Sequence, residues 1–285
     1  MKLRISIFGV GLIGGSWALA MRHAGMTHEI IGCSRSENHL AEAKKLGVID
    51  RYTLDPAEAV RDADVVILAV PLGAMQSVCK QIQAHLSPQA ILTDVGSAKA
   101  SVIEAVRQGL GEIPPRFVPG HPIAGTEKSG VGAAFDSLFD GRRVILTPLE
   151  HTDPSAVNRV RGLWELTGAQ VELMAVEEHD QVLAATSHLP HILAFGLVDC
   201  LAGMREQEEI FRYAAGGFKD FTRIASSDPV MWRDICLANR EAILKIMALY
   251  QKDLQQLTTA IEQGNGDELL GIFQRAKAAR DRFCL

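Results

Sequence analysis

Short runs of β-branched and other apolar residues alternate with amphipathic stretches through residue 175 of the chain. The runs predict strands at 3–8, 29–33, 65–70, 90–95, 117–119, 144–147 and 171–174. Such alternation predicts a mostly parallel sheet covered by helices. From Val176 onward no comparable run occurs, and long amphipathic windows such as 177–202 and 229–263 predict a helical half. We therefore expect an α/β fold followed by an all-α region.

The length of 285 residues favours two domains, because single cores tend to split as chains approach this size. We place the boundary near residue 175, where the last predicted strand leads directly into a helix, and expect domains at 1–175 and 176–285. The apolar stripes of the helical half have no sheet to cover them. We expect a second copy to bury them in a homodimer; the alternative is packing on the first domain alone.

Composition narrows the class of protein. Apolar residues make up 47% of the chain and charged residues 22%, as in folded globular proteins. A formal net charge of -5 gives no broad basic field, so we expect neither nucleic acid nor an anionic membrane as a partner. The five cysteines never form a CxxC pair, and neither a leader nor a long apolar span is evident. A reducing cytoplasmic location fits these features.

A glycine-rich segment follows the first predicted strand and opens a predicted helix. It is Gly9-Val10-Gly11-Leu12-Ile13-Gly14, a GxGxxG pattern. In this context the glycines permit a tight turn and the close approach of a pyrophosphate, which the N–H groups at the helix start bind. The pattern predicts a Rossmann-like dinucleotide site, and the alternative is a purely structural turn.

The second predicted strand ends at Ser34, Arg35 and Ser36, with no acidic residue. An acid at this place binds the adenosine ribose of NAD, whereas an arginine and hydroxyls suit a 2′-phosphate. We therefore expect NADP as the cofactor, with NAD possible. The alternative is an Arg35 that stacks on adenine without discriminating between the two.

Three polar clusters lie at predicted strand ends, where ligands of open parallel sheets bind. They are Val70-Pro71, the segment from Asp94 to Ser97, and Gly120-His121-Pro122. Neutral imidazole is a suitable proton acceptor near neutral pH, which makes His121 the candidate base. In the alternative reading His121 only binds its own turn, while Asp94 and Ser97 only cap a helix.

These motifs together resemble the prephenate and arogenate dehydrogenase family. The resemblance rests on the segment from Gly9 to Ser16, on Asp-Val-Gly-Ser at 94–97, and on His-Pro-Ile-Ala-Gly-Thr-Glu-Lys-Ser-Gly at 121–130. It continues through Ser-His-Leu-Pro-His at 187–191 and through 217–235, and so covers nearly the whole chain. It implies NAD(P)-dependent oxidative decarboxylation of a cyclohexadienyl acid, arogenate or prephenate, in tyrosine biosynthesis.

The resemblance also implies roles for individual residues. His121 would accept the proton of the ring hydroxyl, and Ser97 would fix the orientation of its imidazole. Arg223 would grip a substrate carboxylate with help from His191, which follows a helix-kinking Pro190. Glu127, Lys219 and Asp220 would form ionic contacts at the pocket mouth, although each alone reads as a solvated charge. His188 and His191 could also be a plain helix-face pair, and no convincing set of metal ligands is present.

Two other functions share this layout. A β-hydroxyacid dehydrogenase would use a lysine in the helical half in place of His121, and a nucleotide-sensing regulator would leave Ser97, His121 and Arg223 without a joint task. Arogenate and prephenate differ only in an amino or a keto group, and no residue decides between them. The association of NADP with arogenate use in the family favours arogenate slightly.

Overall fold

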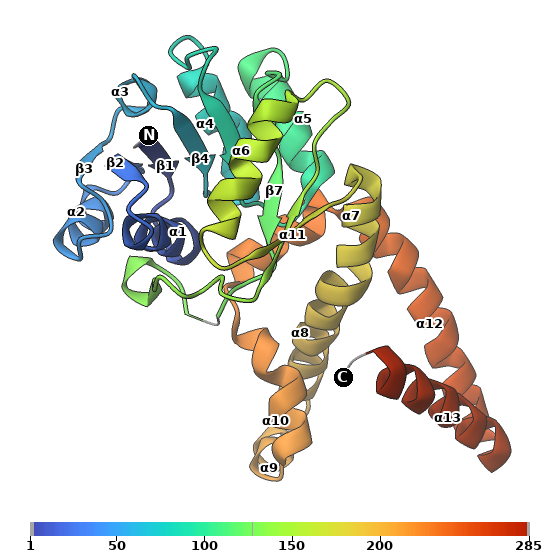
Figure 1. The fold of residues 1–285 in the computed structure, drawn as a ribbon. Helices are drawn as coiled ribbons and strands as arrows, with labels where there is room; N and C mark the ends of the chain where they lie inside the picture. The colour runs from blue at the N-terminus through green and yellow to red at the C-terminus, as the bar shows by residue number, and fades with distance from the viewer. Residues whose placement is uncertain (1–2, 127, 284–285) are drawn as a thin grey trace. The chain divides into compact units, whose positions relative to one another are not determined.

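The computed structural model describes residues 3–126 and 128–283, and Figure 1 shows its α/β region followed by helices. The main sheet comprises β1 (Leu3–Phe8), β2 (Thr27–Cys33), β3 (Arg51–Thr53), β4 (Val65–Leu68), β5 (Ile91–Asp94) and β6 (Phe117–Val118). All pairs are parallel, and the order is β3-β2-β1-β4-β5-β6. This is the strand order of dinucleotide-binding folds, in which the crevice opens where the order reverses, beside β1 and β4.

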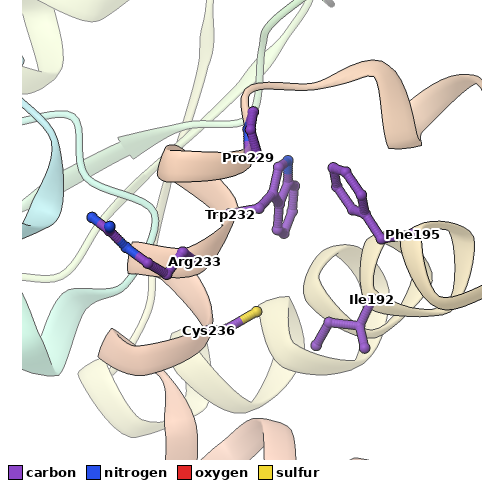
Figure 2. Close-up of a pocket in the computed structure, with 6 residues that line it drawn as sticks. All are labelled: Ile192, Phe195, Pro229, Trp232, Arg233 and Cys236. Atoms are coloured by element: carbon purple, nitrogen blue, oxygen red, sulfur yellow. The ribbon is translucent and has the colours of Figure 1, made fainter. Parts of the chain in front are cut away.

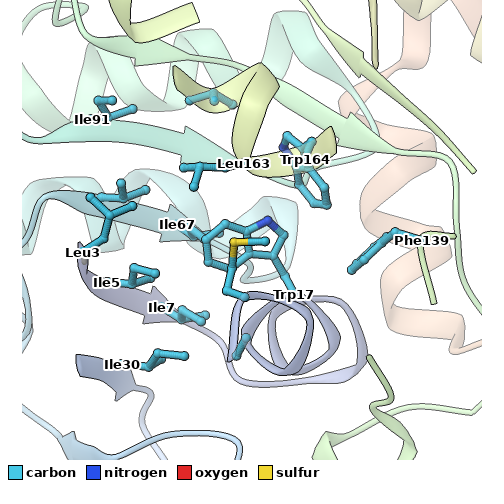
Figure 3. Packing of buried hydrophobic residues seen from close by; sticks show 14 of the residues in the cluster. Leu3, Ile5, Ile7, Trp17, Ile30, Ile67, Ile91, Phe139, Leu163 and Trp164 are labelled. Carbon is cyan, nitrogen blue, oxygen red and sulfur yellow. The ribbon is translucent and has the colours of Figure 1, made fainter. Parts of the chain in front are cut away.

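Alternation along the strands divides the core between the two faces of this sheet. Ile5 and Ile7 face one cluster with Trp17 and Trp164, whereas Phe8 and the alternate β4 residues face the other. Figure 3 shows the first cluster, in which Trp17 and Trp164 meet edge to face at 6.2 Å. The connecting helices are α1 (Leu12–His23), α2 (Glu37–Lys45), α3 (Pro56–Val60), α4 (Met75–Ile82), α5 (Lys99–Leu110) and α6 (Pro154–Glu165), with a 3₁₀ turn η1 (Leu72–Ala74) before α4. These layers confirm the expected α/β fold.

A second, three-stranded sheet follows the main one. It contains β7 (Gly120–Pro122), β8 (Arg143–Leu146) and β9 (Gln170–Leu173), and a 3₁₀ turn η2 (Val131–Ala133) lies between β7 and β8. Since β7 is antiparallel to β8, His121 pairs with Ile145 on a strand, and its expected placement in a turn was wrong. The short strand β3 was not predicted either, because three residues give too little alternation to recognise.

The remainder of the described chain is helical, as expected. Its helices are α7 (Val176–Leu183), α8 (Leu189–Ala202), α9 (Gln207–Arg212), α10 (Gly216–Thr222), α11 (Pro229–Ala238), α12 (Arg240–Glu262) and α13 (Gly266–Phe283), with a 3₁₀ turn η4 (Arg223–Ser226) after α10. The predicted window 229–263 is divided at Asn239, which ends α11. The chain forms two compact units, 1–240 and 241–285. The division by role at residue 175 stays a prediction.

Between α7 and α8 the helix widens into a π turn, η3 (Ala184–His188). Pro190 follows it in the first turn of α8, so the proline does not end the helix. A π turn changes the backbone hydrogen-bond pattern, and here it lies directly before a residue that has no N–H to donate. The expected kink or end at Pro190 is therefore replaced by a local widening.

The segment Val176–Ala202 is, by length and composition alone, long and apolar enough to cross a membrane. This corrects the expectation that the chain has no such stretch. The same test is passed by core helices of folded domains, and this segment carries His179 and Asp180, both of which are buried and hydrogen-bonded within the protein.

Candidate active site

The glycine loop connects β1 to α1 through a backbone that excludes side chains. Gly9 has a φ of +91°, and a Cβ there would lie 2.3 Å from the Ala69 carbonyl oxygen. A Cβ on Gly14 would lie 2.5 Å from the Gly9 carbonyl oxygen, whereas one on Gly11 would meet no protein atom within 4 Å. Gly9 and Gly14 therefore allow the close packing of the loop, and Gly11 leaves open space beside the helix start.

That helix start suits an anion. Gly11 is the N-cap of α1 and offers no side-chain cap, and the first turn contains no acidic residue. The first N–H groups of α1, including those of Leu12 and Ile13, therefore have no carboxylate or hydroxyl cap. Helix N-termini of this kind bind pyrophosphate, so the residues present fit a dinucleotide.

Ser34, Arg35 and Ser36 follow β2 on the same edge of the sheet. Arg35 is exposed and forms no hydrogen bond or ion pair with any residue that the structure describes. The Ser36 hydroxyl accepts a hydrogen bond of 3.4 Å from the backbone of His39 and so caps α2, while the Ser34 hydroxyl donates to the Ser36 carbonyl. Arg35 is thus available to a ligand at the start of α2.

The ends of β4 and β5 lie beside this loop. A Cβ on Gly9 would lie 3.2 Å from the Val70 backbone nitrogen, and Pro71 opens the turn η1 next to it. The segment from Asp94 to Ser97 leads from β5 into α5. Two of the three clusters predicted from the sequence, Val70-Pro71 and the segment from Asp94 to Ser97, therefore follow neighbouring parallel strands at one edge of the main sheet, whereas Gly120-His121-Pro122 forms β7 of the second sheet.

A buried ion pair joins β5 and α5 to β7. The Lys99 ammonium lies 2.5 Å from Asp94 Oδ2 and donates to the Gly120 carbonyl oxygen at 2.5 Å, and neither charged side chain is exposed. The Asp94 carboxylate also accepts from the backbone of Gly96 at 2.7 Å and of Gly120 at 3.1 Å. Burial lowers the pKa of Lys99, although the Asp94 charge opposes that shift. The pair fixes the residue that precedes His121.

His121 is buried, with 9% of its surface exposed. Its Nδ1 lies 2.9 Å from His179 Nε2, and His179 Nδ1 lies 2.8 Å from Asp180 Oδ1. Burial lowers the pKa of His121 well below its ordinary value, and repulsion from His179, Lys99 and His188 lowers it further. The imidazole is therefore neutral at neutral pH, which is the state that a proton acceptor needs.

Ser97 stands at the entrance to α5 and is half-buried. Its hydroxyl forms no hydrogen bond with His121 in the described chain, where His179 occupies Nδ1 of that ring. His188, which is 1% exposed, is held at Nδ1 by the Asn239 amide at 3.1 Å. Burial lowers the pKa of His188 to about 4, while the Asp180 charge and the Ser97 backbone oppose the shift.

An open pocket of about 300 Å³ lies between the helices α8 and α11 and is lined by Ile192, Phe195, Pro229, Trp232, Arg233 and Cys236. Figure 2 shows Ile192 and Phe195 on α8 facing Trp232 and Cys236 on α11. His191 stacks on Trp232 with ring centroids 3.7 Å apart and planes 20° apart, and its Nδ1 contacts the Ser187 carbonyl at 2.9 Å. Burial lowers the pKa of His191. The half-buried imidazole is thus held in one orientation.

Arg223 begins η4, which packs against α8, the helix of His191. Arg223 and Lys219 are both exposed, and Lys219 lies on α10, which also packs against α8. Glu127 lies outside the residues that the structure describes. Arg223 and Lys219, the two cationic residues expected to contact the substrate, therefore lie on elements that both pack against the helix of His191.

Comparison with known proteins decides the family. Residues 17–173 match the family model described as prephenate dehydrogenase, nucleotide-binding domain, and residues 175–275 match prephenate dehydrogenase, dimerization domain. The chain belongs to the prephenate dehydrogenase family. It is 40% identical to cyclohexadienyl dehydrogenase of Zymomonas mobilis, with 97% of this chain and 94% of the relative covered.

Solved structures agree with this assignment. Prephenate dehydrogenase from Aquifex aeolicus, in complex with hydroxyphenyl propionate and NAD⁺, superposes with a TM-score of 0.90 at 40% identity, covering 98% of this chain and 97% of the other. Synechocystis arogenate dehydrogenase gives a TM-score of 0.81 at 31% identity, covering 99% and 100%. The enzyme is therefore a nicotinamide-dependent dehydrogenase of tyrosine biosynthesis, and the family assignment favours this over the hydroxyacid dehydrogenase and sensor alternatives.

The dehydrogenase site contains residues that sequence reasoning missed. His179, Asp180, Lys99 and Asn239 are all buried and join the elements around His121. Lys99 lies five residues after Asp94 and could have been recognised as its partner. His179 and Asp180 stand in the polar run Glu177–Asp180, which the sequence presents as an ordinary acidic helix start, so no local signal marks their burial.

Proposed function

We propose that this enzyme oxidatively decarboxylates a cyclohexadienyl acid, converting arogenate to tyrosine, prephenate to 4-hydroxyphenylpyruvate, or both. The observation that carries the proposal is the neutral, buried His121 beside the strand ends that form the dinucleotide site. His121 Nε2 accepts the proton of the ring hydroxyl as the carbon that bears it becomes a ketone. The bond to the ring carboxylate then breaks, carbon dioxide leaves, and the bonding electrons pass through the ring to the ketone oxygen, which takes up a proton as the ring becomes aromatic. The nicotinamide cofactor supplies the hydride acceptor.

The helical side supplies the substrate contacts in this proposal. Arg223 binds a substrate carboxylate, because a guanidinium offers paired donors that match it. His191 assists, and its stacking on Trp232 supports a fixed orientation. Lys219 forms an ionic contact at the pocket mouth, and Ser97 lies beside the nicotinamide.

For the cofactor we propose a preference for NADP over NAD. Arg35 supports it, because this exposed guanidinium directly follows β2 and none of residues 34–36 is acidic. The start of α2 adds a helix N-terminus beside it. The preference in turn favours arogenate by association with NADP use in the family.

We also propose a homodimer located in the cytoplasm. The second compact unit leaves large apolar side chains exposed along α12 and α13, including Leu249 at 61%, Ile261 at 66% and Phe273 at 57%. Exposed apolar stripes of this kind are usually buried in an interface. Sedimentation at micromolar concentration should give twice the chain mass of 30.9 kDa, and a chain-mass species would contradict the dimer.

Reduced-cofactor formation, measured with prephenate or arogenate against NAD or NADP, tests the reaction. We expect turnover in at least one of the four combinations, and none in any would overturn the proposal. His121→Asn should lower kcat on the order of 10²- to 10⁴-fold while cofactor binding stays near the wild-type level. Near-normal turnover of His121→Asn would refute the assigned base.

Arg35→Ala tests the cofactor preference. Charge-assisted hydrogen bonds are worth about 1.5–3 kcal/mol, so we expect NADP binding to weaken roughly 10- to 100-fold and NAD binding to change little. Arg61→Ala removes an equal charge from an exposed site and serves as the control. Equal weakening of both cofactors in Arg35→Ala would contradict a phosphate contact.

A further inference from the structure

A continuous path of hydrogen bonds leads from His121 to α7. His121 Nδ1 contacts His179 Nε2 at 2.9 Å, and His179 Nδ1 contacts Asp180 Oδ1 at 2.8 Å. His179 is 0% exposed and Asp180 is 6% exposed, so water does not compete for either contact. The proposed function uses only the first member of this path.

Asp180 is anchored by a helix that is distant in the sequence. Its Oδ1 accepts from the backbone N–H of Lys99 at 2.8 Å, and its Oδ2 accepts from that of Ala100 at 3.0 Å, so the carboxylate caps α5. The natural N-cap of α5, Ala98, offers no side-chain oxygen. Burial alone would raise the pKa of Asp180, but the bonds from His179, Lys99 and Ala100 lower it below its ordinary value. Asp180 is therefore an ionised acceptor.

The ionised carboxylate determines where the imidazole protons sit. A carboxylate only accepts, so the proton of a neutral His179 must be on Nδ1, which leaves its Nε2 as an acceptor. His121 must then donate from Nδ1. The remaining nitrogen, His121 Nε2, carries the lone pair and has no hydrogen-bond partner among the described residues.

Resting on the proposed role of His121, we propose that His179 and Asp180 are positioning residues that hold His121 in its Nδ1–H tautomer. The basic nitrogen is thereby kept free for the ring hydroxyl. When Nε2 takes the hydroxyl proton, the positive charge that develops on His121 is stabilised through His179 by the Asp180 carboxylate. No covalent bond to the protein forms, and neither positioning residue touches the substrate.

Two substitutions at residue 179 separate this role from simple packing. His179→Leu removes both bonds, and we expect kcat to fall on the order of 10²- to 10⁴-fold, the range for loss of a correctly presented base. KM and the cofactor Kd should stay within about threefold, because His179 contacts neither ligand in the proposal. His179→Gln retains a carbonyl acceptor for Nδ1 of His121 and should recover at least about tenfold of the lost kcat.

The tautomer itself is measured by nitrogen NMR on enzyme labelled with ¹⁵N in its histidine rings. The His121 signals are identified by their disappearance in His121→Asn. In the wild type we expect Nδ1 to be protonated, and in His179→Leu we expect the proton to move to Nε2. Asp180→Asn should cause the same move, since its amide nitrogen can donate to His179 Nδ1 and reverse both bonds.

Leu183→Ala is the matched control. Leu183 is 5% exposed on α7, one turn after His179, and contributes no hydrogen bond to the path from His121. We expect lower stability from the cavity it leaves, with kcat within about threefold of the wild type.

The outcomes separate the two proposals. If His179→Leu keeps kcat within about threefold of the wild type, or if His121 in that variant stays protonated on Nδ1, the positioning role is overturned. The proposed function still stands in that case, provided that His121→Asn is inactive. If His121→Asn itself turns over normally, the proposed function fails. Equal kcat losses in His179→Leu and Leu183→Ala would show a packing role only and also overturn the proposal.

Discussion

Replacement of Lys99 by methionine tests the buried ion pair that fixes the strand of His121. Methionine has nearly the length of lysine without its charge, so Lys99→Met leaves the Asp94 carboxylate buried at 0% exposure with only backbone donors. It also removes the Lys99 bond to the Gly120 carbonyl. The substitution therefore leaves the Asp94 carboxylate and the Gly120 carbonyl oxygen buried without the ammonium that both contact.

The expected cost follows from that geometry. Breaking a buried pair by removing one partner costs roughly 3–5 kcal/mol, and the stranded carbonyl is part of the same site, so we expect a loss of about 4 kcal/mol in the free energy of unfolding. In the double variant Asp94→Asn/Lys99→Met neither member of the pair carries a charge. Because neutral replacement of a whole pair is often nearly neutral, we expect it to recover about half of that loss or more.

Urea unfolding at one fixed protein concentration measures these differences, since the stability of a dimer depends on concentration. Lys44→Met removes an exposed lysine from α2 and should change the free energy of unfolding by less than about 0.5 kcal/mol. A loss below about 1 kcal/mol for Lys99→Met would refute the reasoning. A double variant no more stable than the single one would refute it equally.

Three further substitutions probe the glycine loop and His188. Gly9→Ala should lower the free energy of unfolding in urea by more than about 2 kcal/mol, because a Cβ at this positive φ clashes with Ala69. Gly11→Ala should leave that free energy nearly unchanged. It should instead weaken cofactor binding about tenfold or more in a fluorescence titration. Equal stability of the two would contradict the assigned geometry. His188 has a pKa of about 4 when folded, so its contribution to stability is complete above its unfolded pKa of about 6.5 and declines as pH falls toward 4. The free energy of unfolding of His188→Gln should lack this decline, which is worth about 3 kcal/mol. If the stability of the variant depended on pH as that of the wild type does, the role given to His188 would be contradicted.

The parts of the site that the sequence predicts are those determined by local pattern. The apolar runs place Asp94 at the end of β5 and Val70 just after β4, and parallel strand direction brings such ends to one edge. The GxGxxG loop has its conformation dictated by its own glycines, so it too is visible in advance. Local pattern thus predicts the dinucleotide loop, but it does not reveal the strand on which His121 lies.

The parts that escaped prediction depend on partners far along the chain. Asp180 is an ordinary helical acid until α5, 81 residues earlier, offers it two backbone donors. His179 likewise stands out only because its ring contacts His121, 58 residues away. The strand β7 is three residues long and is recognisable only through its pairing with β8. Periodicity reports which face of an element is apolar, but not which polar side chain will find a buried partner.

The cap that Asp180 places on α5 makes the two predicted halves of the chain unsuitable as interchangeable modules. A chimera that joined residues 1–175 to the helical half of a relative would take its proposed base from one parent and the carboxylate support of that base from the other. Its α5 would begin correctly only if the incoming half presented a carboxylate at the same place. The natural unit of exchange in this enzyme therefore spans the predicted domain boundary.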